Sequence, residues 1–436
     1  MVYARTEVHV FMSRVIVIGA GAAGLMAAVA ASDMGHKVTV IEKNEKAGKK
    51  IFITGKGRCN LTNDCDTNDF FDHVARNPKF LYSSIYSFDH DMVKAFFEEN
   101  GCPVKTERGE RVFPVSDHAY DVTGALTSHL RKAHVGIQFN TKVQAILFDK
   151  PKQVRGVRLD DGRELPSDAV IVCTGGLSYK STGSTGDGYR FAKAAGLDVT
   201  PTSPSLVPFE IAEKWPEELQ GLALKNIEVT ITPIQNEEPE KDNCHSGKKA
   251  KPVYSGFGEM LFTHFGVSGP LVLTASTMCD FVKYPSGFRL LLDTKPAIPE
   301  NELENRVKKI FEEAPDRHYV NAIQSLFPSR FGDIIARLSG IDIGRTAKSI
   351  NSKELGELCR LIKAVPMTIS GTRGFDEAVI TKGGVSVKEI DPSTMESKSV
   401  SGLYFAGEVL DVDAVTGGFN LQIAWSTGHL AGSSIR

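Results

Sequence analysis

Short apolar, β-branched segments and one alanine-rich segment alternate at the start of the chain. Residues 14–18 (RVIVI) predict a buried parallel strand, and residues 22–32 predict a buried helix that Gly35 closes. Residues 37–41 (KVTVI) predict the next strand, and Glu42 ends it. This order predicts a βαβ unit, the building block of a parallel sheet covered by helices.

The alternation of helices and strands continues and then returns near the end of the chain. The pattern predicts a helix at residues 121–134, three short strands up to about 165, a buried strand at 169–173 and a helix at about 189–195. Residues 403–406 predict a buried strand, and residues 421–430 predict a helix for which Asn420 is a suitable N-cap. Both ends of the chain are therefore expected in one α/β domain.

The middle of the chain has a different pattern, which begins at Pro201, Pro204 and Pro208. Strand-like segments at 224–234, 257–263 and 287–293 precede helices near 300–314, 318–339 and 352–363. The polar residues 235–252 predict a hairpin tip. An apolar strand pattern returns at 365–370, where we expect the chain to re-enter the first domain.

The predicted fold class is α/β: a split Rossmann-like domain with a doubly wound parallel sheet, and an inserted mixed β-barrel-like and helical domain. The expected boundaries are an extension at 1–12, the Rossmann-like domain at 13–199 and 365–436, and the insert at 200–364. The residues ahead of Met12 are expected to lack a fixed structure.

Composition limits the classes of function. The 436 residues carry 51 Lys+Arg and 53 Asp+Glu, so no bulk positive field recruits nucleic acid or an anionic membrane. The uncharged run 15–31 is shorter than the roughly 20 residues of a membrane span, and we interpret it as strand, turn and helix rather than a signal peptide. Seven cysteines at irregular spacing predict neither a disulfide framework nor a zinc site, so we expect no metal and a cytoplasmic protein.

The first βα turn has the spacing G-x-G-x-x-G. Gly19 permits the tight turn, Gly21 lets the backbone approach a pyrophosphate, and Gly24 lets helix and strand pack closely. Glu42, eighteen positions after Gly24, is placed to accept hydrogen bonds from adenosine ribose hydroxyls. The turn predicts a bound dinucleotide, but this fingerprint does not separate FAD from NAD.

The C-terminal segment 402–432 decides between the two cofactors. Gly407-Glu408 puts an acid at a strand end, where it meets the ribityl or pyrophosphate region. Gly417-Gly418 allows a close backbone approach ahead of a helix whose start stabilises negative charge at the N1/C2 edge of a reduced flavin. Such an element has little use in an NAD-only enzyme, so we predict FAD.

Six segments together sharpen this prediction: GKGRCNLTN (55–63), TGGLSYKSTGSTGDGY (174–189), GEMLFTHFGVSGP (258–270), TKGGV (381–385), TMESK (394–398) and GLYFAGEVLDVDAVTGGFNLQ (402–422). In this order they resemble the bacterial BaiN-type flavoprotein family of NAD(P)/FAD-dependent oxidoreductases, over nearly the whole chain from Met12. The resemblance implies FAD in a split Rossmann domain with an inserted domain over the flavin. One branch of that family reduces conjugated enones of bile-acid intermediates. Lys180 departs from the family, whose members commonly carry Pro there.

The segment GKGRCNLTNDC holds Cys59 and Cys65, whose place after the second strand is typical of disulfide-reducing flavoproteins. Their spacing differs from C-x4-C, and acidic neighbours such as Asp66 would raise the pKa of the Cys65 thiol. The resemblance puts this segment against FAD, with Lys56 and Arg58 neutralising the pyrophosphate. We interpret it as a cofactor-wrapping loop; a redox pair and a purely structural loop are the alternatives.

The expected cofactor-binding residues come from these segments. They are Gly19, Ala20, Gly21, Ala23, Gly24, Glu42, Lys43, Lys56, Gly57, Arg58, Cys59, Asn60, Val143, Thr174, Gly175, Gly176, Gly407, Glu408, Gly418, Asn420 and Leu421. Asp187 is either a helix cap or a polar contact near the flavin. His264 and Tyr179 are catalytic candidates, although His264 also fits a satisfied interdomain histidine and Tyr179 a packing residue.

The predicted function is that of an FAD-dependent oxidoreductase that transfers hydride through flavin N5 to or from a small organic substrate, an enone or C=C reductase among the options. The sequence has no second G-x-G-x-x-G, so NAD(P)H would dock transiently over the flavin. The alternatives are an amine or hydroxy-acid oxidase and a non-catalytic flavin-bearing sensor or partner-binding protein. The charge balance weighs against a tRNA-modifying flavoprotein. We expect a small-molecule substrate, with no nucleic-acid or membrane partner, and make no prediction of oligomeric state.

Overall fold

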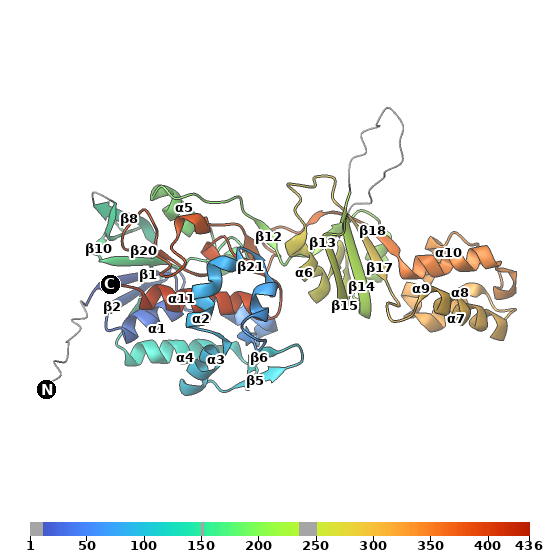
Figure 1. The fold of residues 1–436 in the computed structure, drawn as a ribbon, viewed down its shortest axis with the longest axis horizontal. Coiled ribbons are helices and arrows are strands. Elements are labelled where there is room, and N and C mark those ends of the chain that lie inside the picture. The colour runs from blue at the N-terminus through green and yellow to red at the C-terminus, as the bar shows by residue number, and fades with distance from the viewer. Residues whose placement is uncertain (1–11, 150–151, 235–250) are drawn as a thin grey trace, which may run out of the picture. The chain divides into compact units, whose positions relative to one another are not determined.

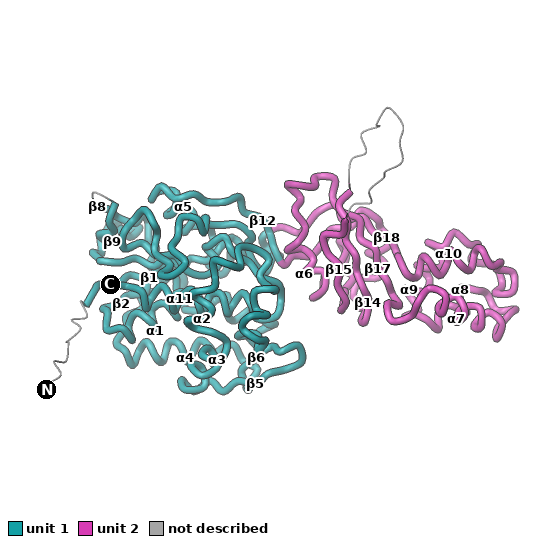
Figure 2. The backbone as a smooth tube through the Cα atoms, viewed as in Figure 1, with its two compact units in different colours: residues 1–205, 375–436 teal, residues 206–374 magenta. Residues whose placement is uncertain are grey.

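The computed structural model describes residues 12–149, 152–234 and 251–436. These residues form two compact units (Figure 2). Unit 1 contains the described residues up to Ser205 together with Phe375–Arg436, and unit 2 is Leu206–Gly374. Within the described residues, no helix combines the length and apolarity needed to span a membrane.

A five-stranded parallel sheet forms the centre of unit 1 (Figure 1). Its order is β20 (Leu403–Phe405), β11 (Ala169–Val172), β1 (Arg14–Ile18), β2 (Lys37–Ile41) and β7 (Gly136–Gln138). The central strand β1 is buried at every position except Arg14. Its unbroken apolar run follows from this place, because helices cover both faces of such a sheet.

Helices α1 (Ala22–Asp33) and α11 (Phe419–Ser433) pack against each other through glycine. A Cβ on Gly428 would lie 2.4 Å from the Ala23 carbonyl oxygen, and a Cβ on Gly432 would lie 2.3 Å from that of Ala27. The pairing of Ala23 with Gly428 and of Ala27 with Gly432 means that the helices run in the same direction. By these pairings, the start of α1 lies beside a point roughly eight residues into α11. The two helix starts are therefore about 12 Å apart along the helix axis.

The remaining elements of unit 1 surround this centre. They are α2 (Tyr82–Ser87), α3 (His90–Glu99), α4 (Ala119–Lys132), α5 (Asp187–Ala194), the sheet β3 (Thr62–Asn63), β6 (Arg111–Pro114) and β5 (Val104–Glu107), the sheet β10 (Glu164–Pro166), β9 (Gln153–Leu159) and β8 (Val143–Asp149), and the pairs β4 (Val74–Arg76) with β21 (Asp413–Ala414) and β12 (Ser203–Ser205) with β19 (Ile380–Lys382). Residues 136–166 thus hold four strands, one more than the three we expected.

Unit 2 is a closed six-stranded antiparallel barrel with helices and a core of its own. The barrel order is β13 (Phe209–Ile211), β16 (Gly266–Ser268), β15 (Tyr254–Thr263), β14 (Ala223–Pro233), β17 (Phe288–Asp293) and β18 (Val365–Thr372). The helices are α6 (Pro270–Met278), α7 (Glu300–Glu313), α8 (Tyr319–Ile323), α9 (Ser329–Leu338) and α10 (Ser352–Lys363). The α/β class with a barrel-like and helical insert is confirmed.

The unit boundaries differ from those we expected. Residues 365–370 belong to β18, which pairs with β13 and β17 of the barrel, so the chain returns to unit 1 at Phe375 rather than at 365. On the other side, β12 pairs with β19, which extends unit 1 to Ser205 instead of 199. An apolar strand pattern identifies a strand but does not say which sheet it joins.

Two further expectations in the middle of the chain have separate outcomes. The helix expected at 318–339 is divided into α8 and α9, and α9 starts directly after Pro328. A proline disfavours helical conformation in the residue before it, which explains the break. Most of the hairpin tip expected at 235–252 and the residues ahead of Met12 lie outside the described residues.

Two helical glycines should respond to alanine in opposite directions. Gly428→Ala forces a Cβ onto the backbone of α1 and is expected to destabilise the protein by about 1–3 kcal/mol. Gly124 lies in α4, and no described atom is within 4 Å of its Cβ position, so Gly124→Ala should stabilise by about 0.5–1 kcal/mol. Urea denaturation measures both free energies of unfolding. An unchanged Gly428→Ala variant would contradict the close packing of α1 and α11.

Candidate cofactor-binding cleft

One cleft of unit 1 lies at the carboxyl ends of the parallel strands, where open α/β sheets bind ligands. The cleft opens to solvent. Twelve of the residues predicted to bind cofactor line it: Gly19, Ala20, Gly21, Ala23, Glu42, Lys43, Val143, Thr174, Gly175, Glu408, Asn420 and Leu421. Gly24, Lys56, Gly57, Arg58, Cys59, Asn60, Gly176, Gly407 and Gly418 are outside this lining.

The three glycines of the first turn have different surroundings. Gly19 has a φ of +104°, and a Cβ there would lie 2.5 Å from the Cys173 carbonyl oxygen. A Cβ on Gly24 would lie 1.8 Å from the Gly19 carbonyl oxygen. No atom of the described residues lies within 4 Å of a Cβ on Gly21, which lines the cleft. Gly19 and Gly24 therefore serve the fold, whereas Gly21 leaves free the space that a pyrophosphate needs.

Hydrogen bonds to the first βα turn and to Asn44 fix the Glu42 side chain at the end of β2. Its Oε2 accepts from the Ala20 N–H at 2.8 Å, and its Oε1 accepts from the Asn44 N–H at 2.8 Å and the Asn44 Nδ2 at 2.7 Å. A carboxylate offers about four lone-pair sites, so acceptor capacity remains for a ribose hydroxyl. The free space at Gly21 and this fixed acid fit the adenosine half of a dinucleotide.

Glu408 is anchored in the same way at the end of β20. Its Oε2 lies 2.6 Å from Lys50 Nζ, and its Oε1 accepts from Ser178 Oγ at 2.7 Å and from the Thr381 N–H at 2.9 Å. Lys50 also donates to Ser178 Oγ at 2.6 Å. This network fixes an acid and an ammonium group on the cleft wall, and Lys50 was not among the residues we predicted.

The start of α11 also reaches the cleft, through Asn420 and Leu421. Gly418, with a φ of +107°, is the N-cap, and a Cβ there would lie 2.4 Å from the Thr62 carbonyl. The predicted N-cap was therefore wrong: Asn420 is already helical, and its side chain bonds the backbone of Ala414. The positive end of this long helix still faces the cleft, as stabilisation of a reduced flavin requires.

The loop that carries GKGRCN packs against this helix start. Trp425 Nε1 donates to the Leu61 carbonyl at 3.0 Å, and Asn63 Nδ2 donates to the Gly417 carbonyl at 3.1 Å. Thr54, at the front of the loop, lines the cleft, whereas the Lys56 side chain is exposed. The loop thus supports the part of the cleft that the start of α11 lines.

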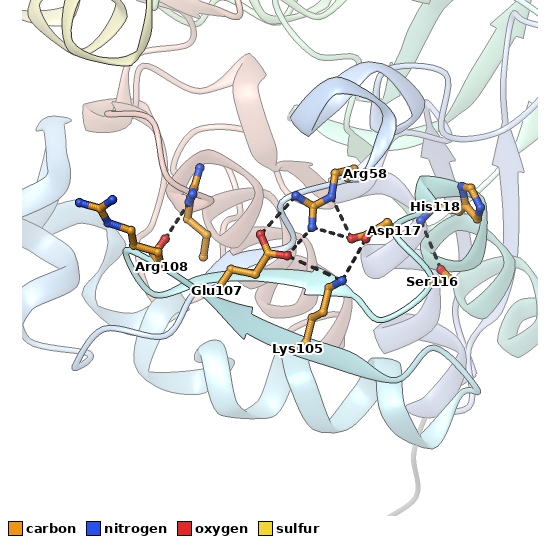
Figure 3. Close-up of polar contacts among 8 residues, drawn as sticks. Arg58, Lys105, Glu107, Arg108, Ser116, Asp117 and His118 are labelled. Carbon is orange, nitrogen blue, oxygen red and sulfur yellow. Dashed lines mark hydrogen bonds and ion pairs between the residues drawn. The ribbon is translucent and has the colours of Figure 1, made fainter. Parts of the chain in front are cut away.

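Arg58 does not play the role we expected. Its guanidinium bonds Asp117 Oδ1 at 2.8 Å through Nε and Glu107 Oε2 at 3.2 Å through Nη1 (Figure 3). Lys105 Nζ donates to Asp117 Oδ2 at 3.0 Å, and Lys105 and Arg58 together lower the pKa of Asp117. Arg58 also stacks on Phe113 at 4.1 Å. Two carboxylates neutralise its charge, so Arg58 holds the loop against β5 and β6 instead of a pyrophosphate.

The described cysteines are free and buried, Cys59 and Cys65 among them. Burial raises the pKa of Cys59 to about 12. Burial, with smaller contributions from Glu110 and Asp69, raises the pKa of Cys65 to about 11. Both thiols therefore stay protonated at neutral pH, which disfavours the redox pair and leaves the structural and cofactor-wrapping interpretations of the loop.

Neither catalytic candidate is among the residues that line the cleft. Tyr179 is half-buried with a φ of +52°, its N–H donates to the Phe375 carbonyl at 3.3 Å, and burial and Glu377 raise its pKa. His264 is exposed in unit 2, between β15 and β16. Asp187 is not a helix cap, because Gly186 is the N-cap of α5 and Asp187 pairs with Lys43 at 2.7 Å.

Several lining residues were missed by the sequence analysis. They are chiefly Asn44, Lys46, Lys49, Lys50, Ile51 and Thr54 after β2, and Thr182, Gly183 and Ser184 ahead of α5. The sequence signal was the lysine-rich segment NEKAGKK, which directly follows Glu42 and Lys43.

Comparisons with known proteins identify the family of the chain. A family model described as the HI0933-like protein Rossmann domain matches residues 13–434. The chain is 31% identical over 425 residues to a 3-dehydro-bile acid delta(4,6)-reductase of Clostridium scindens, covering 97% of this chain and 98% of that protein. It is also 31% identical over 423 residues to a ribosomal RNA dihydrouridine synthase of Haemophilus influenzae, covering 96% and 98%.

A solved structure shows a similar fold. It is the 3-ketosteroid delta1-dehydrogenase of Sterolibacterium denitrificans in complex with 1,4-androstadiene-3,17-dione. The TM-score is 0.51 at 13% identity, with 97% of this chain and 98% of that chain covered. At this identity the likeness concerns the fold alone.

Gly21→Val should fold but lose FAD. A Cβ at this position has no described protein atom within 4 Å, so the new side chain is expected to extend into the space of the pyrophosphate. The matched control is Gly136→Val on the edge strand β7, where a Cβ also meets nothing described within 4 Å but lies outside the cleft lining. Circular dichroism checks the fold, and flavin released on boiling measures the cofactor. A yellow Gly21→Val protein would contradict the cofactor assignment.

Cys59→Ala and Cys65→Ala should keep bound FAD and the rate of flavin reduction, because neither protonated thiol carries electrons. In the wild-type protein, both thiols should react with a thiol reagent only after unfolding. Stopped-flow absorbance measures reduction, and mass spectrometry locates the labelled thiols. Loss of flavin reduction in either variant, with FAD retained, would restore the redox pair.

Proposed function

The chain belongs to the HI0933-like family of FAD-dependent oxidoreductases, and from this premise we propose that it reduces a carbon–carbon double bond conjugated to a carbonyl group. The observation that carries the proposal is the end-to-end similarity to two relatives with different substrates. A delta(4,6)-reductase and a dihydrouridine synthase, by their names, both add two hydrogens across such a bond. The reaction type is therefore the feature that the relatives have in common.

The described residues support this chemistry from both ends of the cleft. Bound FAD supplies a hydride acceptor and donor at N5. Glu42 and the space above Gly21 bind its adenosine half, and the start of α11 stabilises negative charge on its other half. The Lys50–Glu408–Ser178 network keeps an ammonium group fixed on the cleft wall.

We assign the role of electron donor to NADH or NADPH. The sequence has a single G-x-G-x-x-G, so the nicotinamide would dock transiently to deliver its hydride. Each turnover then consumes one NAD(P)H and one proton. The substrate gains a hydride at the carbon distant from the carbonyl and a proton at the adjacent carbon, which balances the reaction.

A small enone is the favoured substrate class. The near-neutral charge of the chain, 51 Lys+Arg against 53 Asp+Glu, provides no bulk attraction for a polyanion. The second candidate is reduction of uridine in ribosomal RNA, which rests on the 31% identity to a ribosomal RNA dihydrouridine synthase. Both candidate substrates contain a double bond conjugated to a carbonyl group. They differ in the molecule that contains this group, which is a small enone or ribosomal RNA.

Anaerobic rapid mixing of the FAD-loaded protein with NADPH or NADH should bleach the visible flavin band. Subsequent addition of a steroid 4-en-3-one should restore the band and yield a product heavier by two hydrogens. Saturated steroid ketone is the control and should restore nothing. Recovery only with ribosomal RNA would replace the enone by uridine. Bleaching only by an amine or hydroxy acid would instead indicate an oxidase, and no bleaching by any reductant a non-catalytic flavoprotein.

A further inference from the structure

Two loops approach each other across the adenosine end of the cleft. One follows β2 and contains Lys43 and Asn44, and the other precedes α5 at residues 182–187. The first follows strand β2 and the second comes after β11, the two strands that flank β1 in the sheet. Both loops line the cleft that the first βα turn opens into. They therefore stand on opposite sides of that turn.

Three hydrogen bonds join the loops directly. Lys43 Nζ donates to Asp187 Oδ2 at 2.7 Å and to Thr185 Oγ1 at 2.6 Å, and Asn44 Nδ2 donates to the Thr182 carbonyl at 3.0 Å. We call these contacts the cross-cleft bridge. A Cβ on Gly183 would lie 2.5 Å from Asn44 Nδ2, so the loops are also pressed together between the bonds.

The ion pair of the bridge is shielded from water. The side chains of Lys43 and Asp187 are 25% and 18% exposed. Burial raises the pKa of Asp187, but the hydrogen bond and charge of Lys43 outweigh this effect and hold the pKa below its usual value. Asp187 is consequently ionised at neutral pH. Asp187 keeps a weaker contact with Arg190, at 3.5 Å.

We propose that the cross-cleft bridge is a gate that sets the rates at which FAD enters and leaves its site. Glu42, the acid for the adenosine ribose, directly precedes Lys43, so the bridge lies at the adenosine end. All its bonds join protein to protein, so they form without a contribution from the cofactor. A barrier of this kind slows passage in both directions and leaves the affinity nearly unchanged. The inference depends on the FAD assignment but not on the substrate.

Lys43→Met tests the gate, because it removes the charge and keeps the aliphatic stem. The rates of FAD uptake by apoprotein and release from holoprotein are measured by the change in flavin fluorescence. Both rates should rise about fivefold to tenfold, as expected for loss of a partly buried ion pair. The ratio of the release rate to the uptake rate, which is the dissociation constant, should stay within about twofold of the wild-type value. Lys43→Arg should restore slow exchange. The free energy of unfolding of the apoprotein separates this effect from general destabilisation and should match that of the control.

Lys94→Met is the matched control. Lys94 is 23% exposed and pairs with Asp64, which is 26% exposed, in the same unit and outside the cleft lining. Its variant should exchange FAD at the wild-type rates. If Lys43→Met releases FAD faster but takes it up at the wild-type rate, Lys43 is a direct cofactor ligand and the gate is overturned. Unchanged uptake and release rates would also overturn the gate. If the wild-type protein does not bind FAD, both the gate and the cofactor assignment are overturned. If the FAD exchange rates are as expected for the gate but no enone is reduced, only the proposed function is overturned.

Discussion

The close contact between α1 and α11 is the constraint on which the rest of unit 1 depends. These helices are separated by almost the whole chain, yet Gly428 and Gly432 bring the backbone of one against the other. Because the helices run in the same direction with starts about 12 Å apart, their positive ends reach different parts of the same cleft. The inserted unit interrupts the sequence between them without interrupting this geometry.

The sequence predicted those features that depend on short stretches of chain. Gly19, Gly21, Gly24 and Glu42 could be assigned because strand, turn, helix and acid follow one another directly. Pairings between distant residues could not be assigned in this way. Arg58 was expected at a phosphate, but Glu107 and Asp117, which come from a later hairpin and turn, neutralise it. The residue types were visible in the sequence, whereas the choice of partner was fixed only by the fold.

The loop around Cys59 shows how such partners shape a site indirectly. Gly55, Lys56, Gly57 and Cys59 all have positive φ values, and this conformation is unfavourable for the lysine and the cysteine. Burial of the Cys59 side chain and the ion pairs of Arg58 hold the loop in this conformation. Cys59 therefore fills buried space, and Arg58 holds the loop against the β5–β6 hairpin. Both residues therefore have a role in the loop that needs no contact with a cofactor.

The pairing of β12 with β19 has a consequence for how such proteins diversify. The chain leaves unit 1 after Ser205 and returns at Phe375, and the flanking strands lie side by side, with Ser205 opposite Ile380. All the residues that line the cleft belong to unit 1. The barrel and its helices thus form a cassette whose two junctions are adjacent, so recombination can exchange it as one piece. Replacement of the cassette would then leave every residue of the cleft lining in place.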